Sequence, residues 1–301
     1  GTSRCSFFGV AGATYLIRVG GKFGTGVGEI DIAWGDVPVP TAEMAPGFTT
    51  GEGANGHHYV VRSLLDGGTW TDAVETAARF GGYPATLTSP GENDFVVVRA
   101  TPSDVGGPTT FGLLQAPRAT DPAEDWAWIT GEEFYFSNWN AGEPNDAGRG
   151  EDFATIYRNG TWNDGAEGFG HVLIEFDERP ELEEATWLPS DGGSGERYRA
   201  VLTELPVSWT EARSMAEALG GRLASMETEA EADFVFDRLV AFHSLWTRTN
   251  YNGGPWVGLE RVEGAWRWSS GADLDWNPWA PGEPNETGDK GCFFSFLDGP
   301  R

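Results

Sequence analysis

Apolar and polar positions follow the same pattern twice along this chain, and each time the pattern predicts two helices. Near residue 70, apolar side chains recur at intervals of three and four, which is typical of an amphipathic helix: Trp70, Ala73, Val74, Ala77 and Ala78. Thr69 and Asp72 are spaced as a capping box before this helix. A double glycine at 81–82 favours its end, and a second helix is predicted to start after Ser89.

The second half of the chain repeats these features at a nearly constant offset in sequence. Trp209 matches Trp70, and Glu283 matches Glu143, at almost the same offset. Ser208 and Glu211 predict another capping box, and Thr228 the start of another helix. Short aromatic alternations at 126–128 and 266–268 predict strands in both halves. The repeat therefore indicates two copies of one α+β domain.

The segment before the repeat has a different pattern. Alternating residues at 14–19 and 29–34, separated by glycine-rich turns, predict strands. We interpret this segment as the terminal strands of a truncated β-sandwich, followed by a Pro- and Gly-rich linker. The predicted organisation is a β-rich segment, a linker, a first copy, a second linker and a second copy: 1–40, 41–55, 56–178, 179–195 and 196–301.

Composition narrows the classes of function. The 301 residues include 39% hydrophobic residues and 14 Trp, which indicates a folded chain. A formal net charge of −26 argues against nucleic acid or an anionic membrane as a partner. No apolar run is long enough to insert into a membrane, and no signal peptide is recognisable, so a chain that starts at Gly1 is expected to be an excised or processed segment. Cys5 and Cys292 are predicted to be unpaired thiols.

The candidate chemistry lies between residues 143 and 164. This stretch is rich in side chains that offer oxygen ligands, namely Glu143, Asn145, Glu151, Asn163 and Asp164. Carboxylate and amide oxygens are ligands that Ca²⁺ prefers, and the stretch contains no Cys or His for a transition metal. His57 and His58 are adjacent on an extended segment, so they point apart and are interpreted as a solvated strand entry.

Several motifs of the first copy then resemble a known family. Phe111-Gly112-Leu113 resembles that family's "WIGL" strand, and Ser137-Asn138-Trp139 precedes Glu143-Pro144-Asn145. Glu151 follows Glu143 by eight residues, and Asn163, within Trp162-Asn163-Asp164, follows Glu151 by twelve. On these residues the chain resembles tandem C-type lectin-like domains of the mannose type. Ala77, Phe153 and Ile174 stand where vertebrate members carry cysteines, so the resemblance is to the disulfide-free bacterial type. The resemblance implies two helices and an irregular antiparallel β-lobe with long loops.

The resemblance also implies a binding site. Its principal Ca²⁺ ligands would be Glu143, Asn145, Glu151, Asn163 and Asp164, the first four of which would also bind the sugar. The peptide bond before Pro144 would be cis. Asp146 would belong to an auxiliary metal site, together with carboxylates from the loop that holds Asp121, Glu124 and Asp125. Glu-Pro-Asn members of the family bind mannose, glucose, N-acetylglucosamine or fucose.

The second copy keeps only part of this motif. Glu283 and Asn285 are present, and Asp289 lies near the position of the next ligand. The counterpart of Trp162-Asn163-Asp164 would fall at about 302–304, past Arg301, so this copy is expected to be C-terminally truncated with a degenerate site.

Three functions are compatible with these residues. The leading one is a calcium-dependent lectin, a recognition or adhesion module of a larger extracellular protein, secreted or at the cell surface, that binds a glycan or a glycosylated surface. The alternative is a protein-binding adhesion module in which calcium only orders loops. A glycoside hydrolase using Glu143 and Glu151 is disfavoured, because carboxylates that share a cation are both ionised and neither is poised as an acid. The sequence therefore predicts a binding protein and not an enzyme.

Overall fold

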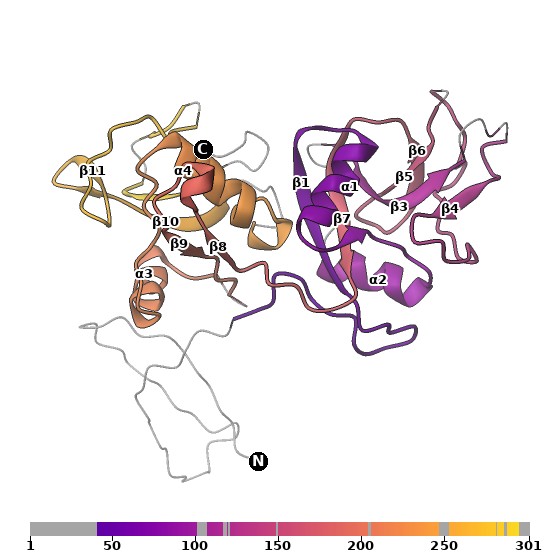
Figure 1. Cartoon of the computed structure of the whole chain (residues 1–301), viewed down its shortest axis with the longest axis horizontal. Coiled ribbons are helices and arrows are strands. Elements are labelled where there is room, and N and C mark those ends of the chain that lie inside the picture. Colours follow the sequence, from indigo (N-terminus) through magenta and orange to yellow (C-terminus); the bar gives the residue numbers. More distant parts are fainter. Residues whose placement is uncertain are drawn as a thin grey trace, which may run out of the picture. The chain divides into compact units, whose positions relative to one another are not determined.

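The computed structural model describes residues 41–294, apart from 101–106, 117–118, 120, 149, 204–205, 247–252, 281 and 286–287. The strands predicted within residues 1–40 and the thiol of Cys5 lie outside the described residues. The described residues belong to one compact unit, Val39–Arg301. We call residues 41–178 the first half and residues 179–294 the second half (Figure 1).

The first half begins with a long strand and two helices at the predicted places. The elements are β1 (His58–Gly68), α1 (Trp70–Arg79), β2 (Tyr83–Pro84) and α2 (Pro90–Arg99). Thr69 and Asp72 form the predicted capping box: Asp72 N donates to Thr69 Oγ1 at 3.1 Å, and Thr69 N donates to Asp72 Oδ2 at 2.8 Å. At α2, Ser89 caps with its side chain alone, which accepts from Glu92 N at 3.2 Å, and Pro90 stands in the first turn. Local capping chemistry thus fixes both helix starts.

The remaining strands of the first half build a mixed sheet. They are β3 (Thr109–Gln115), β4 (Trp126–Trp128), β5 (Phe153–Ile156), β6 (Trp162–Gly165) and β7 (Phe169–Phe176). The order is β1-β7-β3-β5-β6, with β2 on β7 and β4 on β3, and only the β3–β7 pair is parallel. Between β4 and β5, residues 129–152 carry no helix or strand among those described. This long excursion holds the Glu-Pro-Asn motif.

Trp162 anchors the excursion to the sheet. Its indole is fully buried and contacts the rings of Phe111, Trp128, Phe136 and Trp139. Its Nε1 donates to Asn93 Oδ1 on α2 at 2.9 Å. The strand predicted at 126–128 is present as β4, and its two tryptophans, Trp126 and Trp128, are buried, with only 7% and 3% exposed. Since Asn163 and Asp164 follow Trp162 directly, this core contact also fixes where they stand.

The second half repeats the helix starts but has smaller sheets. Its elements are β8 (Glu184–Thr186), η1 (Pro189–Asp191), β9 (Arg197–Arg199), α3 (Trp209–Ala218), α4 (Glu229–Val235), the π-helix η2 (Phe236–Val240), η3 (His243–Leu245), β10 (Gly253–Val262), β11 (Ala265–Trp268) and β12 (Lys290–Phe294). Ser208 and Glu211 form the predicted capping box, and Thr228 caps α4. The sheets are β11-β10-β12 and β8-β9. β8 and η1 lie in the predicted linker 179–195. Because β8 pairs with β9, this segment belongs to the second half.

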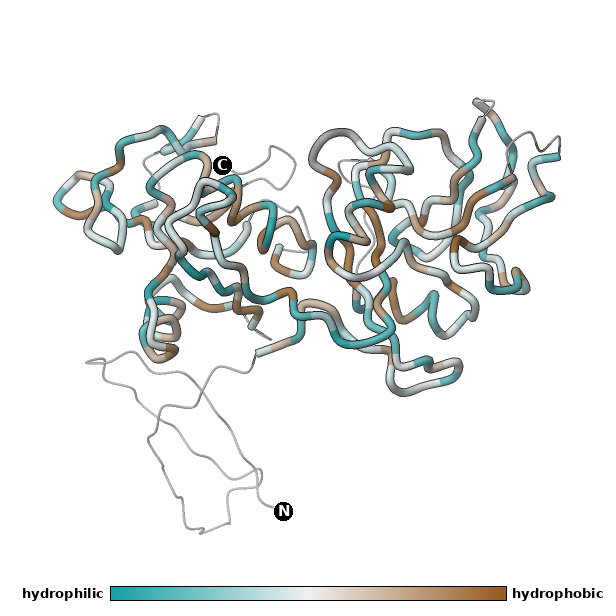
Figure 2. The backbone as a smooth tube through the Cα atoms, in the orientation of Figure 1, coloured by the Kyte–Doolittle hydropathy of each residue, from teal (hydrophilic) through white to brown (hydrophobic). Residues whose placement is uncertain are grey.

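Apolar residues are distributed among polar ones along the backbone and do not gather in one long run (Figure 2). No helix in the described part of the chain is both long and apolar enough to cross a membrane.

A buried arginine joins the two halves. Arg62 on β1 is 2% exposed, and its Nη2 donates to Asp237 of η2 at 2.6 Å, both to the carboxylate and to the main-chain oxygen. Ser63 N donates to Ala241 O at 3.0 Å, and the fully buried Phe242 packs within the hydrophobic cluster of β1, α1 and β7. This contact was not foreseen from the sequence.

Candidate functional site

The candidate site is built where the excursion meets β6. Asn140 N donates to Trp162 O, and Trp162 N donates to Asn138 O, both at 2.8 Å. The chain then turns through Glu143 and Pro144, whose peptide bond is cis, as predicted. Main-chain pairing next to Trp162 thus carries the Glu-Pro-Asn tripeptide alongside Asn163 and Asp164.

Asp164 ties the two segments together. Its side chain is 1% exposed, and its Oδ2 accepts from Asn145 N at 2.9 Å and from Asp146 N at 2.7 Å. Its other oxygen, Oδ1, is buried and has no hydrogen-bond partner among the described residues. Burying a carboxylate oxygen without a partner costs free energy, so this atom is placed to receive a cation or a donor.

Like charges gather around this carboxylate. Burial raises the pKa of Glu143 above its ordinary value. A hydrogen bond to Asp164, the negative charge of Asp164 and the negative charge of Glu151 raise it further, in that order. Asn145 Nδ2 donates to Glu143 Oε2, and Asn163 Nδ2 donates to Asp164 O. Asn145 is exposed and the other predicted ligands, apart from Asp164, are half-buried, so the cluster opens to solvent. Mutual repulsion among the carboxylates would be relieved by a cation.

Asp146 has a structural part in the same loop. Its backbone takes a positive φ of 46°, and its Oδ1 accepts from Gly150 N at 2.7 Å and from Glu151 N at 3.2 Å. These contacts set the turn that brings Glu151 back toward Glu143. In the neighbouring loop, Asp121 Oδ1 accepts from Ala123 N at 2.9 Å. Gln115 Nε2 donates at 2.8 Å to the main-chain oxygens of Asp121 and Glu124.

In the described ranges, no three His, Cys, Asp or Glu side chains are arranged to hold a metal by themselves. Two of the five predicted ligands are amides, Asn145 and Asn163. The donor set itself is oxygen-only and anionic, with one orphaned carboxylate oxygen. It therefore fits a hard cation such as Ca²⁺.

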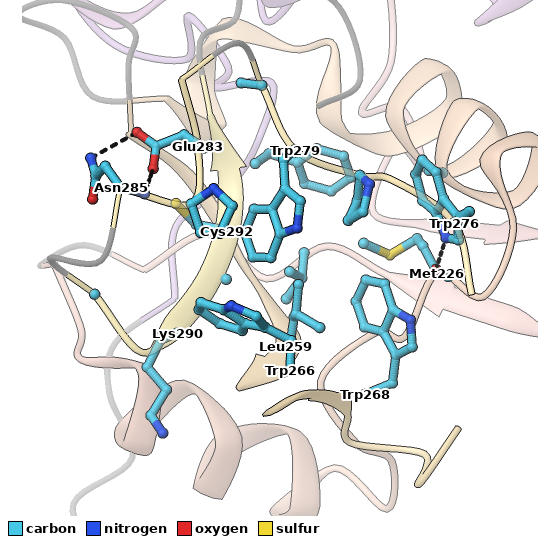
Figure 3. A pocket seen from close by; sticks show the side chains of 18 residues that line it. Met226, Leu259, Trp266, Trp268, Trp276, Trp279, Glu283, Asn285, Lys290 and Cys292 are labelled. Carbon is cyan, nitrogen blue, oxygen red and sulfur yellow. Dashed lines mark hydrogen bonds between the residues drawn. The ribbon is translucent and has the colours of Figure 1, made fainter. Parts of the chain in front are cut away.

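The motif of the second half is arranged differently. The Glu283–Pro284 bond is also cis, but the Glu283 carboxylate accepts from Asn285 N and from Asn285 Nδ2, both at 2.9 Å. Lys290 lies with its Nζ 3.1 Å from Glu260 Oε2 and 4.6 Å from the ring centroid of Trp209. Asp289 is exposed, and its Oδ2 lies 3.8 Å from Lys290 Nζ. Glu283 and Asn285 flank a cavity of about 210 Å³ lined by tryptophans (Figure 3).

A buried polar network in the first half was missed in the sequence. Tyr59 OH donates to Glu92 Oε1 at 2.5 Å and to Glu175 Oε1 at 3.1 Å, and both glutamates are 1% exposed. His57 Nδ1 lies 2.6 Å from Glu175 Oε1. The interpretation of His57 as a solvated strand entry is therefore wrong, because a buried carboxylate needs a partner. His58 does point elsewhere, with Nδ1 3.0 Å from Ala45 O.

The network had one sequence signal. Glu175 is the lone acidic residue in the otherwise apolar run of β7, FGHVLIEF. Burial raises its pKa, while hydrogen bonds from His57 and from Thr86 N oppose that rise. The network joins β1, α2 and β7 and stands apart from the predicted ligand cluster in sequence.

Comparisons with known proteins find a similarity to C-type lectin domains in part of this chain. Residues 205–294 match the family model described as "Lectin C-type domain". The low affinity immunoglobulin epsilon Fc receptor of mouse (Mus musculus) is 33% identical over 82 residues, which is 27% of this chain and 22% of that relative. The chain thus spans about a fifth of that relative's length.

Solved structures of such domains are also similar. One is the cow carbohydrate-recognition domain of CD23 in the presence of a GlcNAc2Man3 oligosaccharide, with 25% identity, 40% of this chain and 86% of that chain covered, and a TM-score of 0.34. Another is the C-type lectin domain of murine dendritic cell inhibitory receptor 2 in complex with N-glycan, with 21% identity, 44% and 96% covered, and a TM-score of 0.35.

The match is to a family of non-enzymatic binding modules, which are typically extracellular or at the cell surface. The match falls on the second half, whereas the complete ligand motif lies in the first half.

Proposed function

We propose that the first half is a second C-type lectin-like domain and that it binds carbohydrate in a calcium-dependent manner. The Ca²⁺ ligands would be the oxygen-bearing side chains of Glu143, Asn145, Glu151, Asn163 and Asp164. One observation carries the proposal: Asp164 fastens the Glu-Pro-Asn loop to β6 through Oδ2 and keeps a buried Oδ1 with no partner in the described part of the chain. A cation at Oδ1 would satisfy this atom and offset the charges of Glu143 and Glu151.

The repeated architecture supports two domains. Each half has a capping box before its first helix, and each carries a Glu-Pro-Asn tripeptide. The tryptophans after the second helix keep the same spacing, because Trp266 and Trp268 match Trp126 and Trp128 at the offset of the two Glu-Pro-Asn motifs. We place the domains at 56–178 and 196–301.

The chain's own side chains suit a neutral sugar. A pyranose offers hydroxyl groups that both donate and accept, and water competes for each of them. The carboxylates of Glu143 and Glu151 can only accept, and the amide groups of Asn145 and Asn163 can donate. Two adjacent hydroxyls would therefore each receive one donor and one acceptor from these four side chains. A Ca²⁺ held by the five predicted ligands would add electrostatic attraction for sugar hydroxyl oxygens. This arrangement favours the mannose, glucose, N-acetylglucosamine and fucose group.

The expected affinities are modest. Three carboxylates against a divalent cation leave the site near −1, which is consistent with an extracellular calcium site of about 10⁻⁴–10⁻³ M. Single sugar sites would be weak, so the domain would act as a recognition or adhesion module within a larger secreted or surface protein. Asp146 is assigned to the loop, with an auxiliary calcium site as a further role.

A protein-binding module is the second candidate, and the second half favours it. There, Glu283 is already hydrogen-bonded by Asn285, and Lys290 is paired with Glu260. Asp289 is the remaining acidic side chain of that degenerate motif in the described region. A site of this kind would order a loop but offers fewer ligands for a shared cation.

The deciding experiment is glycan binding in millimolar Ca²⁺ and again in chelator, by calorimetry with mannose-terminated glycopeptide. We expect binding by the wild type in calcium, loss of binding in chelator, and loss in Asn163→Ala. Asn285→Ala is the matched control, since it removes an amide of the motif in the second half and should leave binding intact. Binding that survives chelation would refute the calcium-bridged mechanism. Absence of any glycan binding would instead favour the protein-binding candidate.

A further inference from the structure

Three arginine side chains converge on one aromatic ring where the two halves meet. The guanidinium carbons of Arg62 on β1, Arg79 at the end of α1 and Arg238 on η2 lie 4.7, 5.8 and 5.8 Å from the centroid of the Phe80 ring. We call these three residues the arginine cluster. A cation–π contact stabilises each cation on the ring, but it does not cancel the repulsion among the three positive charges.

One carboxylate serves the whole arginine cluster. Asp237 Oδ1 lies 2.6 Å from Arg62 Nη2, and Asp237 Oδ2 lies 2.5 Å from Arg79 Nη2. Both oxygens of this carboxylate are therefore in use. The guanidinium of Arg238 contacts the Phe80 ring and has no hydrogen-bond or ion-pair partner among the described residues. Three cations and one anion leave this place with a net charge of +2.

This charge ratio is the reverse of that in the chain as a whole. The sequence holds 46 Asp and Glu against 20 Lys and Arg. On α3, for example, the single guanidinium of Arg213 lies near two carboxylates, those of Glu217 and Glu260. A local excess of positive charge within so acidic a chain attracts a small anion, whereas the surrounding negative surface repels a long polyanion.

The outer part of the arginine cluster is accessible to a ligand. Arg62 is buried and its donors are engaged, with Nη1 donating to Ser63 O at 2.9 Å and Nη2 to Asp237, so it contributes a fixed charge. The Arg79 side chain is 46% exposed, and Arg238 is half-buried. Burial lowers the pKa of Arg62 and Asp237 opposes that effect, but the charges of Arg79 and Arg238 lower it further, so the three cations act on one another.

We propose that the arginine cluster binds a tetrahedral oxyanion, namely a phosphate or sulfate group, either free or as the monoester of a sugar. Arg79 and Arg238 would contact the oxyanion, because a planar guanidinium presents paired N–H donors that match two of its oxygens. Arg62 would add its buried charge, and Asp237 would remain bound to it. A dianion would neutralise the net charge of +2. The site uses none of the five predicted calcium ligands, so it stands independently of the proposed sugar binding.

The location gives the bound oxyanion an effect on stability. Arg79 belongs to the first half and Arg238 to the second half, so the oxyanion would bridge α1 and η2. A ligand that binds only the folded chain raises the free energy of unfolding. Phosphate should therefore raise the Tm of the wild type, and sodium chloride at matched ionic strength should not.

The test is a calorimetric titration of the full chain with inorganic phosphate, with glucose 6-phosphate and with glucose as the blank. The buffer is freed of calcium on a chelating resin, because a soluble chelator is itself a polyanion. We expect one phosphate to bind per chain, and Arg238→Gln to weaken that binding at least tenfold. The glucose 6-phosphate arm identifies the source: affinity equal to that of inorganic phosphate indicates a monoester ligand, and much weaker affinity indicates the free ion.

The matched control is Arg213→Gln. The Arg213 side chain is 48% exposed, close to the value for Arg79, but it is paired with Glu217. This variant should keep the wild-type phosphate affinity. Arg238→Gln removes a cation without breaking an ion pair in the described part of the chain, and an unchanged Tm in phosphate-free buffer verifies that it is folded.

Three outcomes would overturn the proposal. Equal phosphate affinity in wild type and Arg238→Gln would show that the arginine cluster is not the site. An equal loss in Arg213→Gln would show diffuse attraction to positive charge instead of a defined site. A wild-type dissociation constant above about 10 mM would show that the cluster serves only to join the halves.

Discussion

Calcium should stabilise this chain through Asp164, and the increment can be worked out. A ligand that binds only the folded state adds RT ln(1 + [L]/Kd) to the free energy of unfolding. With about 10 mM Ca²⁺ and a dissociation constant of about 10⁻⁴–10⁻³ M, the increment is about 1.4–2.7 kcal/mol. For a unit of this size, that corresponds to an increase in Tm of about 3–10 °C.

Asp164→Asn should remove most of this increment. Oδ2 of Asp164 is occupied by Asn145 N and Asp146 N, so Oδ1 is the oxygen left for a cation. The amide keeps one acceptor for the loop but replaces the other oxygen with a donor and removes one negative charge. A calcium affinity lowered by about a hundredfold would reduce the increment in about 10 mM Ca²⁺ to a few tenths of a kcal/mol.

The assay is thermal unfolding of wild type and Asp164→Asn in chelator and in the same calcium concentration. The compared quantity is the increase in Tm on adding calcium, so any effect of the substitution on the calcium-free protein cancels. Glu283→Gln is the matched control in the second half and should keep the full increment. Equal increments in wild type and Asp164→Asn, or no increment in the wild type, would refute the assignment.

Three other predictions follow from buried or charged groups. Burial lowers the pKa of His171 from its ordinary 6.5 to about 4, so the unfolded chain binds a proton more readily than the folded one. The free energy of unfolding should therefore fall by about 2 kcal/mol between pH 7 and pH 5, as measured by urea unfolding. His171→Phe should abolish this decrease. Trp162→Ala removes a fully buried indole and should cost about 3–5 kcal/mol of unfolding free energy by denaturant titration, whereas a cost below about 1 kcal/mol would contradict its anchoring role. Sugar affinity measured by calorimetry should decrease on acidification, because Glu143, Glu151 and Asp164 must be deprotonated to hold calcium; a flat affinity from neutral pH to pH 4 would contradict this.

Local patterns predicted much of the secondary structure. Helix starts are determined by side chains within three residues of each other, so Thr69 with Asp72 and Ser208 with Glu211 are visible in the sequence and present in the structure. The burial of Trp126 and Trp128 also followed from alternation along a short strand. These features depend on neighbours in the chain, which a sequence shows directly.

Long-range features were less predictable. The partner of Glu92 is Tyr59, 33 residues away, and the partner of Glu175 is His57, 118 residues away, so no local pattern relates them. The pairing of β8 with β9 was not predictable either, because β8 lies in a segment whose composition resembles a linker. At the candidate site, spacing suggested the five ligands, but the fastening of the loop by Asp164 Oδ2 became evident only in three dimensions.

The guanidinium of Arg62 has a consequence for how this chain can be rearranged. Repeated domains are often assumed to be exchangeable one at a time by genetic recombination. Here, separating the halves would remove the Asp237 carboxylate from Arg62 on β1 and from Arg79 on α1. Phe242 would leave the same core. The two halves are therefore expected to fold as one unit, because Asp237 pairs with both Arg62 and Arg79 and Phe242 packs in the core of the first half.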